Sequence, residues 1–245
     1  MTLSDLRTAT ASYLHKVVTN LTVNSLDLFL AAVNQARMTA ELGCDFEFTR
    51  KIMSINVDGV TGGNLSTAVE YGTSTAFPIK TVLDVGQFDI YGNLVPVEWT
   101  VTEASLNIQR QNNPGVIVRY PTDAQVVSSP LGWRRFQFSG NKIYPFPRAA
   151  GVVFTLGVEA YVFTDDYAAG DYAAGSLSDL KTIWLTKGAQ YLQWATIVQI
   201  NQLFKDFVFR QEGNLPPPQD LATAGLAAIQ TWDSFRYTQF RRKTR

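Results

Sequence analysis

Residue types that commonly bind metals or act in catalysis are scarce in this chain of 245 residues. It contains one cysteine, Cys44, and one histidine, His15. Disulfide frameworks, zinc sites built from cysteine and histidine, catalytic triads and Cys–His pairs all need more of these residues than the chain supplies. The sequence therefore predicts no metal, no cofactor and no catalytic residue, and it argues against most familiar hydrolase chemistry.

Two weaker patterns do not change this prediction. Gly59-x-x-Gly62-Gly63 lacks the following Lys-Ser/Thr of a phosphate-binding loop, so a β-turn explains it better. The acidic residues Asp165-Asp166, Glu98 and Glu103 have no evident partners, and a sequence gives no distance between carboxylates that would define a glycosidase pair. We expect a non-enzymatic protein; a glycan hydrolase is an alternative for which no residue can be named.

The C-terminal segment 236–245 holds five of the 21 basic residues and no acidic residue, so it carries +5 while the rest of the chain carries −5. This pattern favours docking on an acidic, grooved partner, with arginines pairing carboxylates and aromatic rings filling pockets. A phosphate-rich partner and a solvated end without function are the alternatives. The docking residues would be Arg236, Tyr237, Phe240, Arg241, Arg242, Lys243 and Arg245.

A second informative segment is a predicted helix over about 189–209. No charged residue occurs from Gly188 to Phe204, and apolar residues cover most of the circumference. Such a helix must be buried on more than one side, either at the centre of the subunit or between the subunit core and a neighbouring subunit. The residues proposed for a subunit interface or a channel are Gln190, Tyr191, Gln193, Trp194, Ile197, Gln199 and Asn201.

These segments must be positioned by elements whose periodicity changes twice along the chain. Residues 1–49 predict two helices, residues 50–163 alternate with period two, and residues 164–235 predict a linker followed by three helices. We therefore predict an α+β fold in which N- and C-terminal helices form a bundle, with an inserted antiparallel β module. The basic segment 236–245 would follow as an extended C-terminal tail.

Local signals predict where several elements begin and end. Thr2, with Asp5 three residues later, or Ser4 is expected to cap the first helix, Asn24 the second, and Ser178 or Ser176 the third. Gly43 is expected just past the second helix, and Pro216–Pro218 as an extended link before the last helix. The longest alternating run is 152–162, and Phe136 and Phe138 precede a hairpin turn at 139–141.

One segment of the chain is an exact tandem duplication, Asp166-Tyr-Ala-Ala-Gly170 and Asp171-Tyr-Ala-Ala-Gly175. A repeat this short cannot form a solenoid. A tolerated duplication in a linker is the simplest interpretation. The strongly apolar stretches of the chain are far too short to span a bilayer, so no membrane association is expected.

Four segments together resemble the head-to-tail adaptor (connector) proteins of tailed bacteriophages. Thr2-Leu-Ser-Asp-Leu-Arg7, followed by the helix at Leu26–Leu42, is similar to the N-terminal helical pair of that family. Cys44-Asp-Phe-Glu-Phe48 resembles its acidic-aromatic junction before the first strand, and Ile143-Tyr-Pro-Phe-Pro147 its run in the β module. The segment 184–195 resembles its late helical hairpin. The long β insertion and the duplicated linker depart from the family pattern.

This resemblance implies a structural protein of the virion neck, assembled in the cytoplasm of the bacterial host. Adaptor subunits form a ring, commonly dodecameric, whose C-terminal segments dock on the portal protein. The lower face of the ring receives tail, nozzle or fibre proteins, and double-stranded DNA passes through its channel. Uncharged Gln and Asn would suit a channel wall, since Lys or Arg would hold phosphates. The alternatives are another neck or tail ring component, such as a stopper or tail-tube protein, and a nucleic-acid-binding module that uses the basic C-terminal arm.

Overall fold

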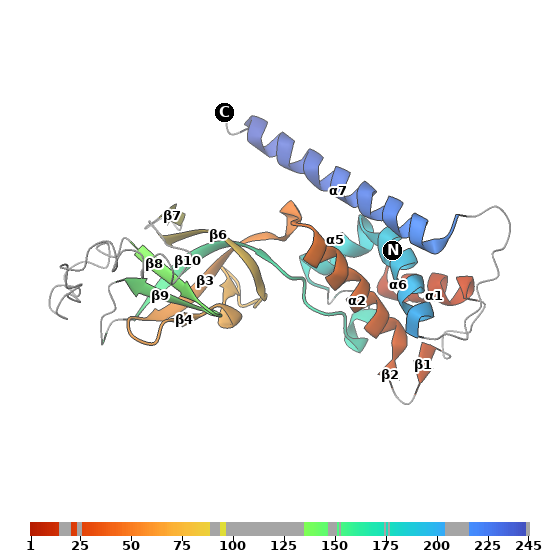
Figure 1. The fold of residues 1–245 in the computed structure, drawn as a ribbon, viewed down its shortest axis with the longest axis horizontal. Coiled ribbons are helices and arrows are strands. Elements are labelled where there is room, and N and C mark those ends of the chain that lie inside the picture. The colour runs from red at the N-terminus through yellow and green to blue at the C-terminus, as the bar shows by residue number, and fades with distance from the viewer. Residues whose placement is uncertain are drawn as a thin grey trace, which may run out of the picture. The chain divides into compact units, whose positions relative to one another are not determined.

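The chain folds into a mixed α+β structure with five helices and antiparallel sheets in the described residues, which confirms the predicted class. The computed structural model describes residues 1–14, 21–23, 26–88, 94–96, 135–146, 151, 153–173, 175, 177–203 and 216–243. The chain divides into two compact units, residues 1–49 with 164–245, and residues 50–163. We call them the helical unit and the β unit. Both ends of the chain therefore contribute to the helical unit (Figure 1).

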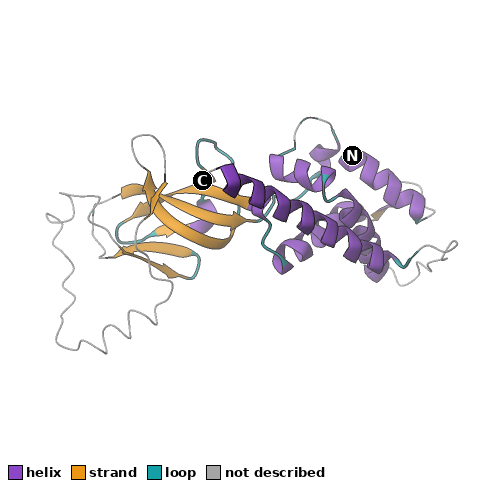
Figure 2. Cartoon of the chain, turned by 90° about the horizontal axis from the view of Figure 1, so that it is seen from above, coloured by secondary structure: helices purple, strands orange, loops and turns teal. Residues whose placement is uncertain are grey.

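The helical unit contains five α-helices, a two-stranded hairpin and two short 3-10 helices in its described part (Figure 2). Its elements are α1 (Leu3–Tyr13), β1 (Thr22–Val23), β2 (Leu26–Asp27), α2 (Leu28–Gly43), η2 (Glu47–Thr49), η5 (Ala169–Tyr172), α5 (Asp179–Thr186), α6 (Ala189–Leu203) and α7 (Pro218–Lys243).

The first two helices begin at side-chain caps, one predicted and one not. Thr2 and Asp5 form the predicted capping box at α1, in which each side chain bonds the other residue's backbone N–H. Asn24 lies outside the described residues, and α2 is capped by Asp27, whose carboxylate accepts from the N–H groups of Phe29 and Leu30. The prediction of a helix from residue 24 is therefore wrong, because residues 26 and 27 pair with β1. Gly43 is the last residue of α2 rather than the residue beyond it.

The later helices correct two further predictions. Ser178 caps α5 as expected, whereas Pro218 is the first residue of α7 instead of belonging to an extended link. Proline suits that position because the missing N–H would have no helical partner there.

The backbone of α7 continues to Lys243, so the prediction of an extended tail beginning at residue 236 is wrong. Once the packed part of a helix has formed, each further residue adds one backbone hydrogen bond without another nucleation cost. Residues 204–209 of the predicted long helix lie outside the described residues, as does His15.

The helix α6 is the centre of the helical unit, where it contacts α1, α2, α5 and α7. Leu192, Ile197 and Ile200 are fully buried. Gly225 allows α7 to pass close to α6, because a Cβ at this position would lie 2.7 Å from the backbone nitrogen of Tyr191. The absence of charge along α6 therefore reflects burial on several sides within one subunit.

The β unit consists of a five-stranded sheet in the order β5-β3-β10-β6-β7 and a three-stranded sheet in the order β4-β9-β8, with every described pairing antiparallel. The elements are β3 (Arg50–Asp58), β4 (Gly63–Asn64), η3 (Leu65–Thr67), β5 (Val69–Glu70), β6 (Ile79–Phe88), β7 (Leu94–Pro96), β8 (Arg135–Ser139), β9 (Lys142–Phe146) and β10 (Val153–Val162). The predicted alternation places Met53, Ile55 and Val57 in the core, opposite Val158, Leu156 and Phe154 of β10.

Two predicted turns of the β unit are confirmed. The β8–β9 hairpin turns at Gly140, whose φ of 57° lies in the left-handed region that favours glycine. The pattern at 59–63 is a turn, in which the Asp58 carboxylate accepts from the N–H groups of Val60 and Thr61.

Candidate interaction surfaces of the helical unit

The structure separates the seven α6 candidates into buried and accessible residues. Tyr191 and Ile197 lie in the core of the helical unit. The Tyr191 hydroxyl donates to the Ala36 carbonyl at 2.8 Å, and burial raises the pKa of Tyr191 to about 12. These two residues were expected at a subunit contact or a channel wall. That expectation is corrected, because Tyr191 contacts Ala36 of α2 and Trp184 of α5 in the same unit, and Ile197 is fully buried within one subunit.

The other five candidates retain some accessible surface. Gln190 is exposed, and the remaining members Gln193, Trp194, Gln199 and Asn201 are half-buried. The Trp194 ring packs edge-on against Tyr13 of α1, with 4.9 Å between ring centroids. These residues remain candidates for contacts with another subunit.

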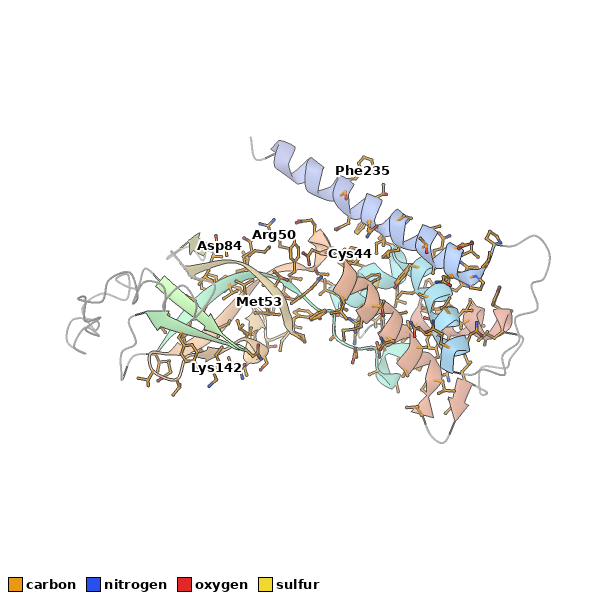
Figure 3. All side chains as sticks on the ribbon, in the orientation of Figure 1. Cys44, Arg50, Met53, Asp84, Lys142 and Phe235 are labelled. Carbon is orange, nitrogen blue, oxygen red and sulfur yellow. The ribbon has the colours of Figure 1, made fainter. Side chains whose placement is uncertain are left out.

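The C-terminal candidates from Arg236 to Lys243 lie on α7, which runs beyond its neighbours in the helical unit (Figure 1), and Arg245 lies outside the described residues. The side chains of Arg236, Tyr237, Phe240, Arg241, Arg242, Lys243 and Arg245 lie outside the described part of the chain. Phe235, directly before them, is 67% exposed and points away from the other helices of the unit (Figure 3). The helical unit without residues 236–245 has 7 basic and 13 acidic residues, a net charge of −6, whereas residues 236–245 carry +5. The charge asymmetry therefore lies within this unit.

Sequence reasoning missed a buried polar network centred on Arg37 and Glu41 of α2. The Arg37 Nη1 donates to the Glu41 Oε2 at 2.7 Å and to the Thr164 carbonyl at 2.6 Å. The Glu41 carboxylate also accepts from the Thr164 N–H, the Thr164 hydroxyl and the Trp184 Nε1. Burial raises the pKa of Glu41, although Arg37 and these donors act in the opposite direction. The network fixes the point at which the chain returns to the helical unit.

The tandem duplication supplies much of the remaining network, so its interpretation as a mere linker is wrong. In the first copy, Asp166 pairs with Arg37 at 2.5 Å, and the Tyr167 hydroxyl donates to the Lys181 carbonyl. The side-chain amide of Asn34 bonds both the N–H and the carbonyl of Tyr167. The first copy thus lies against α2 and α5.

The second copy uses the same residue types for different contacts. Asp171 pairs with the buried Lys181 at 2.8 Å, and the Tyr172 hydroxyl donates to Asp27 at 2.9 Å. Arg7 lies over the Tyr172 ring and also pairs with Asp27. The two copies therefore occupy two different sites.

The adjacent residue Asp165 also has partners that the sequence did not reveal. Its carboxylate accepts from Lys181 at 2.7 Å and from the Ser178 hydroxyl at 2.8 Å. Burial opposes the charged form of Lys181, but hydrogen bonds and charge attraction from Asp165 and Asp171 raise its pKa above the usual value. This arrangement explains how a lysine can be buried as a cation.

A second carboxylate holds the chain where it leaves the helical unit. Asp233 of α7 is only 4% exposed and accepts from the backbone N–H groups of Glu47 and Phe48 at 2.6 and 3.0 Å. The Phe48 ring lies against Trp232 and Trp184. Asp233 thereby ties the last helix to the segment that precedes β3.

These clusters bind parts of the same chain to one another, and their geometry suits structural stability. In the residues described here, no group of three or more His, Cys, Asp and Glu side chains is placed to hold a metal ion. No described helix is long and apolar enough to cross a membrane. Comparison with models of protein families and with curated protein sequences gives no match for the chain.

Proposed function

We propose that this chain is a structural, non-enzymatic virion protein that forms the head-to-tail adaptor ring of a tailed bacteriophage. In this proposal, helices α1, α2, α5, α6 and α7 act as a bundle that builds the wall of the ring. The basic end of α7 docks on the portal protein. The β unit meets tail, nozzle or fibre proteins, and double-stranded DNA passes through the ring.

The four sequence segments that resemble adaptor proteins support this assignment, and so does the character of α7. A helix of 26 residues is roughly 39 Å long, and five basic residues gather at or just beyond its end. The remainder of the same unit carries −6, so the net positive charge of the unit is confined to this end of the chain. A concentrated, helical, aromatic-containing cation suits an acidic protein groove.

The five helices argue against a stopper or tail-tube protein, for which a mostly β chain would be expected. A nucleic-acid-binding module is the second candidate, because residues 236–245 have five basic residues and no acidic residue. Filter binding to double-stranded DNA distinguishes the two: phosphate contacts predict an affinity that falls steeply as salt increases. Salt-sensitive DNA binding without portal binding would favour the second candidate.

The direct test is binding to the portal protein encoded in the same genome. We expect deletion of residues 236–245 to abolish binding while the thermal unfolding transition is retained. A matched variant that replaces Arg236, Arg241, Arg242 and Arg245 by Lys keeps the charge but loses bidentate pairing, so its binding should be intermediate. Unchanged portal binding by the deletion variant would refute the docking proposal.

A further inference from the structure

Both copies of the tandem duplication meet the helical unit through the same two residue types. Their aspartates pair with buried cations, Asp166 with Arg37 and Asp171 with Lys181. By contrast, the described alanine and glycine residues of the two copies, at positions 168, 169, 170, 173 and 175, are exposed. The aspartate and the tyrosine of each copy therefore decide how well that copy fits its place.

The tyrosines of the two copies also have matching surroundings. The Tyr167 hydroxyl donates to the Lys181 carbonyl at 3.1 Å, and the Tyr172 hydroxyl donates to the Asp27 carboxylate at 2.9 Å. A cation lies over each ring, with Lys181 5.7 Å from the Tyr167 centroid and Arg7 4.9 Å from the Tyr172 centroid. We call these two places the Tyr167 site and the Tyr172 site. Because the copies are identical in sequence, the second copy has the side chains that the Tyr167 site requires.

The ends of the segment that contains both copies are tied together. The Asp165 carboxylate accepts from the Ser178 hydroxyl at 2.8 Å. If Tyr172 took the place of Tyr167, the chain would have to return from residue 172 to residue 178, and six residues span up to roughly 20 Å when extended. The entropy of closing a loop changes only slowly with its length. A segment shortened by one copy is therefore long enough to close.

Lys181 has two carboxylate partners, and this arrangement allows the copies to exchange. Asp165 lies 2.7 Å from its ammonium group and Asp171 lies 2.8 Å from it. An exchange would place Asp171 beside Arg37 in the position of Asp166, while Lys181 kept Asp165. Breaking a buried ion pair is strongly destabilising because it leaves a buried charge without a partner. After the exchange, each of these two cations still has a carboxylate partner.

We infer that the duplication is a two-register strap, in which the Tyr167 site accepts either copy. The register of this structure fills both sites and is therefore the major one. In the second register the second copy fills the Tyr167 site, the first copy forms a loop after Asp165, and the Tyr172 site opens beside Arg7. The strap thereby releases five residues, up to roughly 17 Å of extended chain, while the helices stay packed. This inference does not depend on the proposed function.

Urea titration of the full-length variants Tyr167→Ala, Tyr172→Ala and the double variant tests this inference. With two registers, Tyr172 moves into the Tyr167 site of Tyr167→Ala, so each single variant still fills that site. The double variant fills neither site, and its midpoint should fall by more than the sum of the two single shifts. Tyr13→Ala is the matched second substitution, since Tyr13 packs against Trp194 instead of the strap, and its shift should simply add to that of Tyr167→Ala.

A fixed register gives a different result in the same titration. Tyr167 is only 3% exposed and Tyr172 is half-buried, so Tyr167→Ala would then shift the midpoint more than Tyr172→Ala. The two shifts would add in the double variant. Additive shifts would therefore overturn the inference.

Two further variants make the test direct. In a crystal structure of Tyr167→Ala we expect the Tyr172 hydroxyl at the Lys181 carbonyl, and a Tyr172 that still bonds Asp27 would overturn the inference. Deleting residues 171–175 gives the same sequence as deleting 166–170, so the single-copy chain tests whether the shortened segment closes. We expect that chain to fold. Failure of the single-copy chain or of Tyr167→Ala to fold, judged by circular dichroism, would also overturn the inference.

Discussion

The buried carboxylates of Glu41 and Asp233 hold the two points at which the chain returns to and leaves the helical unit. Glu41 of α2 accepts from the N–H and hydroxyl of Thr164, and Asp233 of α7 accepts from the N–H groups of Glu47 and Phe48. The partners lie 123 to 186 residues apart in sequence. The helical unit therefore depends on polar contacts between its N-terminal and C-terminal parts in addition to its apolar core.

Asp233→Asn should destabilise the helical unit by about 1–3 kcal/mol, because one amide oxygen cannot replace both carboxylate oxygens as acceptors for the N–H groups of Glu47 and Phe48. The free energy of unfolding from urea titration measures this loss. Asp220→Asn is the control, since Asp220 is exposed in the first turn of the same helix and should lose less than about 1 kcal/mol. Equal effects of the two substitutions would show that Asp233 does not hold η2.

Glu41→Gln should destabilise the protein by about 1–3 kcal/mol, because the amide cannot accept from Arg37, Thr164 and Trp184 with two oxygens as the carboxylate does, while Arg37 keeps Asp166 as a partner. The pH dependence has a defined sign. Burial raises the pKa of Glu41 above its ordinary value of 4.5, so the folded state binds more protons than the unfolded state just above that pH. The stabilising contribution of Glu41 is fully present below its ordinary pKa of 4.5. It is lost as the pH rises through the higher pKa that Glu41 has in the folded protein. The stability difference between the native chain and Glu41→Gln should therefore be larger near pH 4.5 than at neutral pH; a difference that grows with pH would contradict the account.

The two copies of the duplication should respond differently to the same substitution. Asp171→Asn removes a buried partner of Lys181 and should cost about 1–3 kcal/mol. Asp166 is 67% exposed at its side chain, so Asp166→Asn should cost less than about 1 kcal/mol. Thermal unfolding of the two variants compares them directly. Equal losses would mean that the copies are equivalent, as an ordinary linker repeat would be.

Gly225→Ala should loosen the packing between α6 and α7. The added methyl group would lie 2.7 Å from the Tyr191 backbone nitrogen, and backbone cannot move aside as a flexible side chain can. We expect a loss of about 1–3 kcal/mol despite the better helix propensity of alanine. Ala224→Gly, at an exposed position of the same helix, is the comparison, with an expected loss of about 1 kcal/mol from propensity alone. A stabilising Gly225→Ala would show that the helices do not approach closely.

Local features were predictable from the sequence, whereas partners distant in sequence were not. The Thr2 capping box, the Ser178 cap and the hairpin around Gly140 depend on residues within a few positions of one another. The alternating run at 152–162 became β10 because one face of that strand is buried against the core. Asn24 was predicted as the cap of α2, but Asp27 caps this helix because residues 26 and 27 pair with β1.

The roles of Asp165, Asp166 and Asp171 could not have been inferred from local patterns, because their lysine and arginine partners are fixed by tertiary packing. The same limit applies to α6. Its lack of charge correctly indicated burial on several sides, but only the packing of α1, α2, α5 and α7 showed that Tyr191 and Ile197 are covered within one subunit.

Electron microscopy of the purified full chain mixed with the portal protein of the same genome tests the adaptor proposal most directly. The account predicts a ring of this chain coaxial with the portal, with residues 236–245 of every copy seated on portal subunits. Absence of any complex at micromolar concentrations, or a complex in which those ten residues make no contact with the portal, would contradict it.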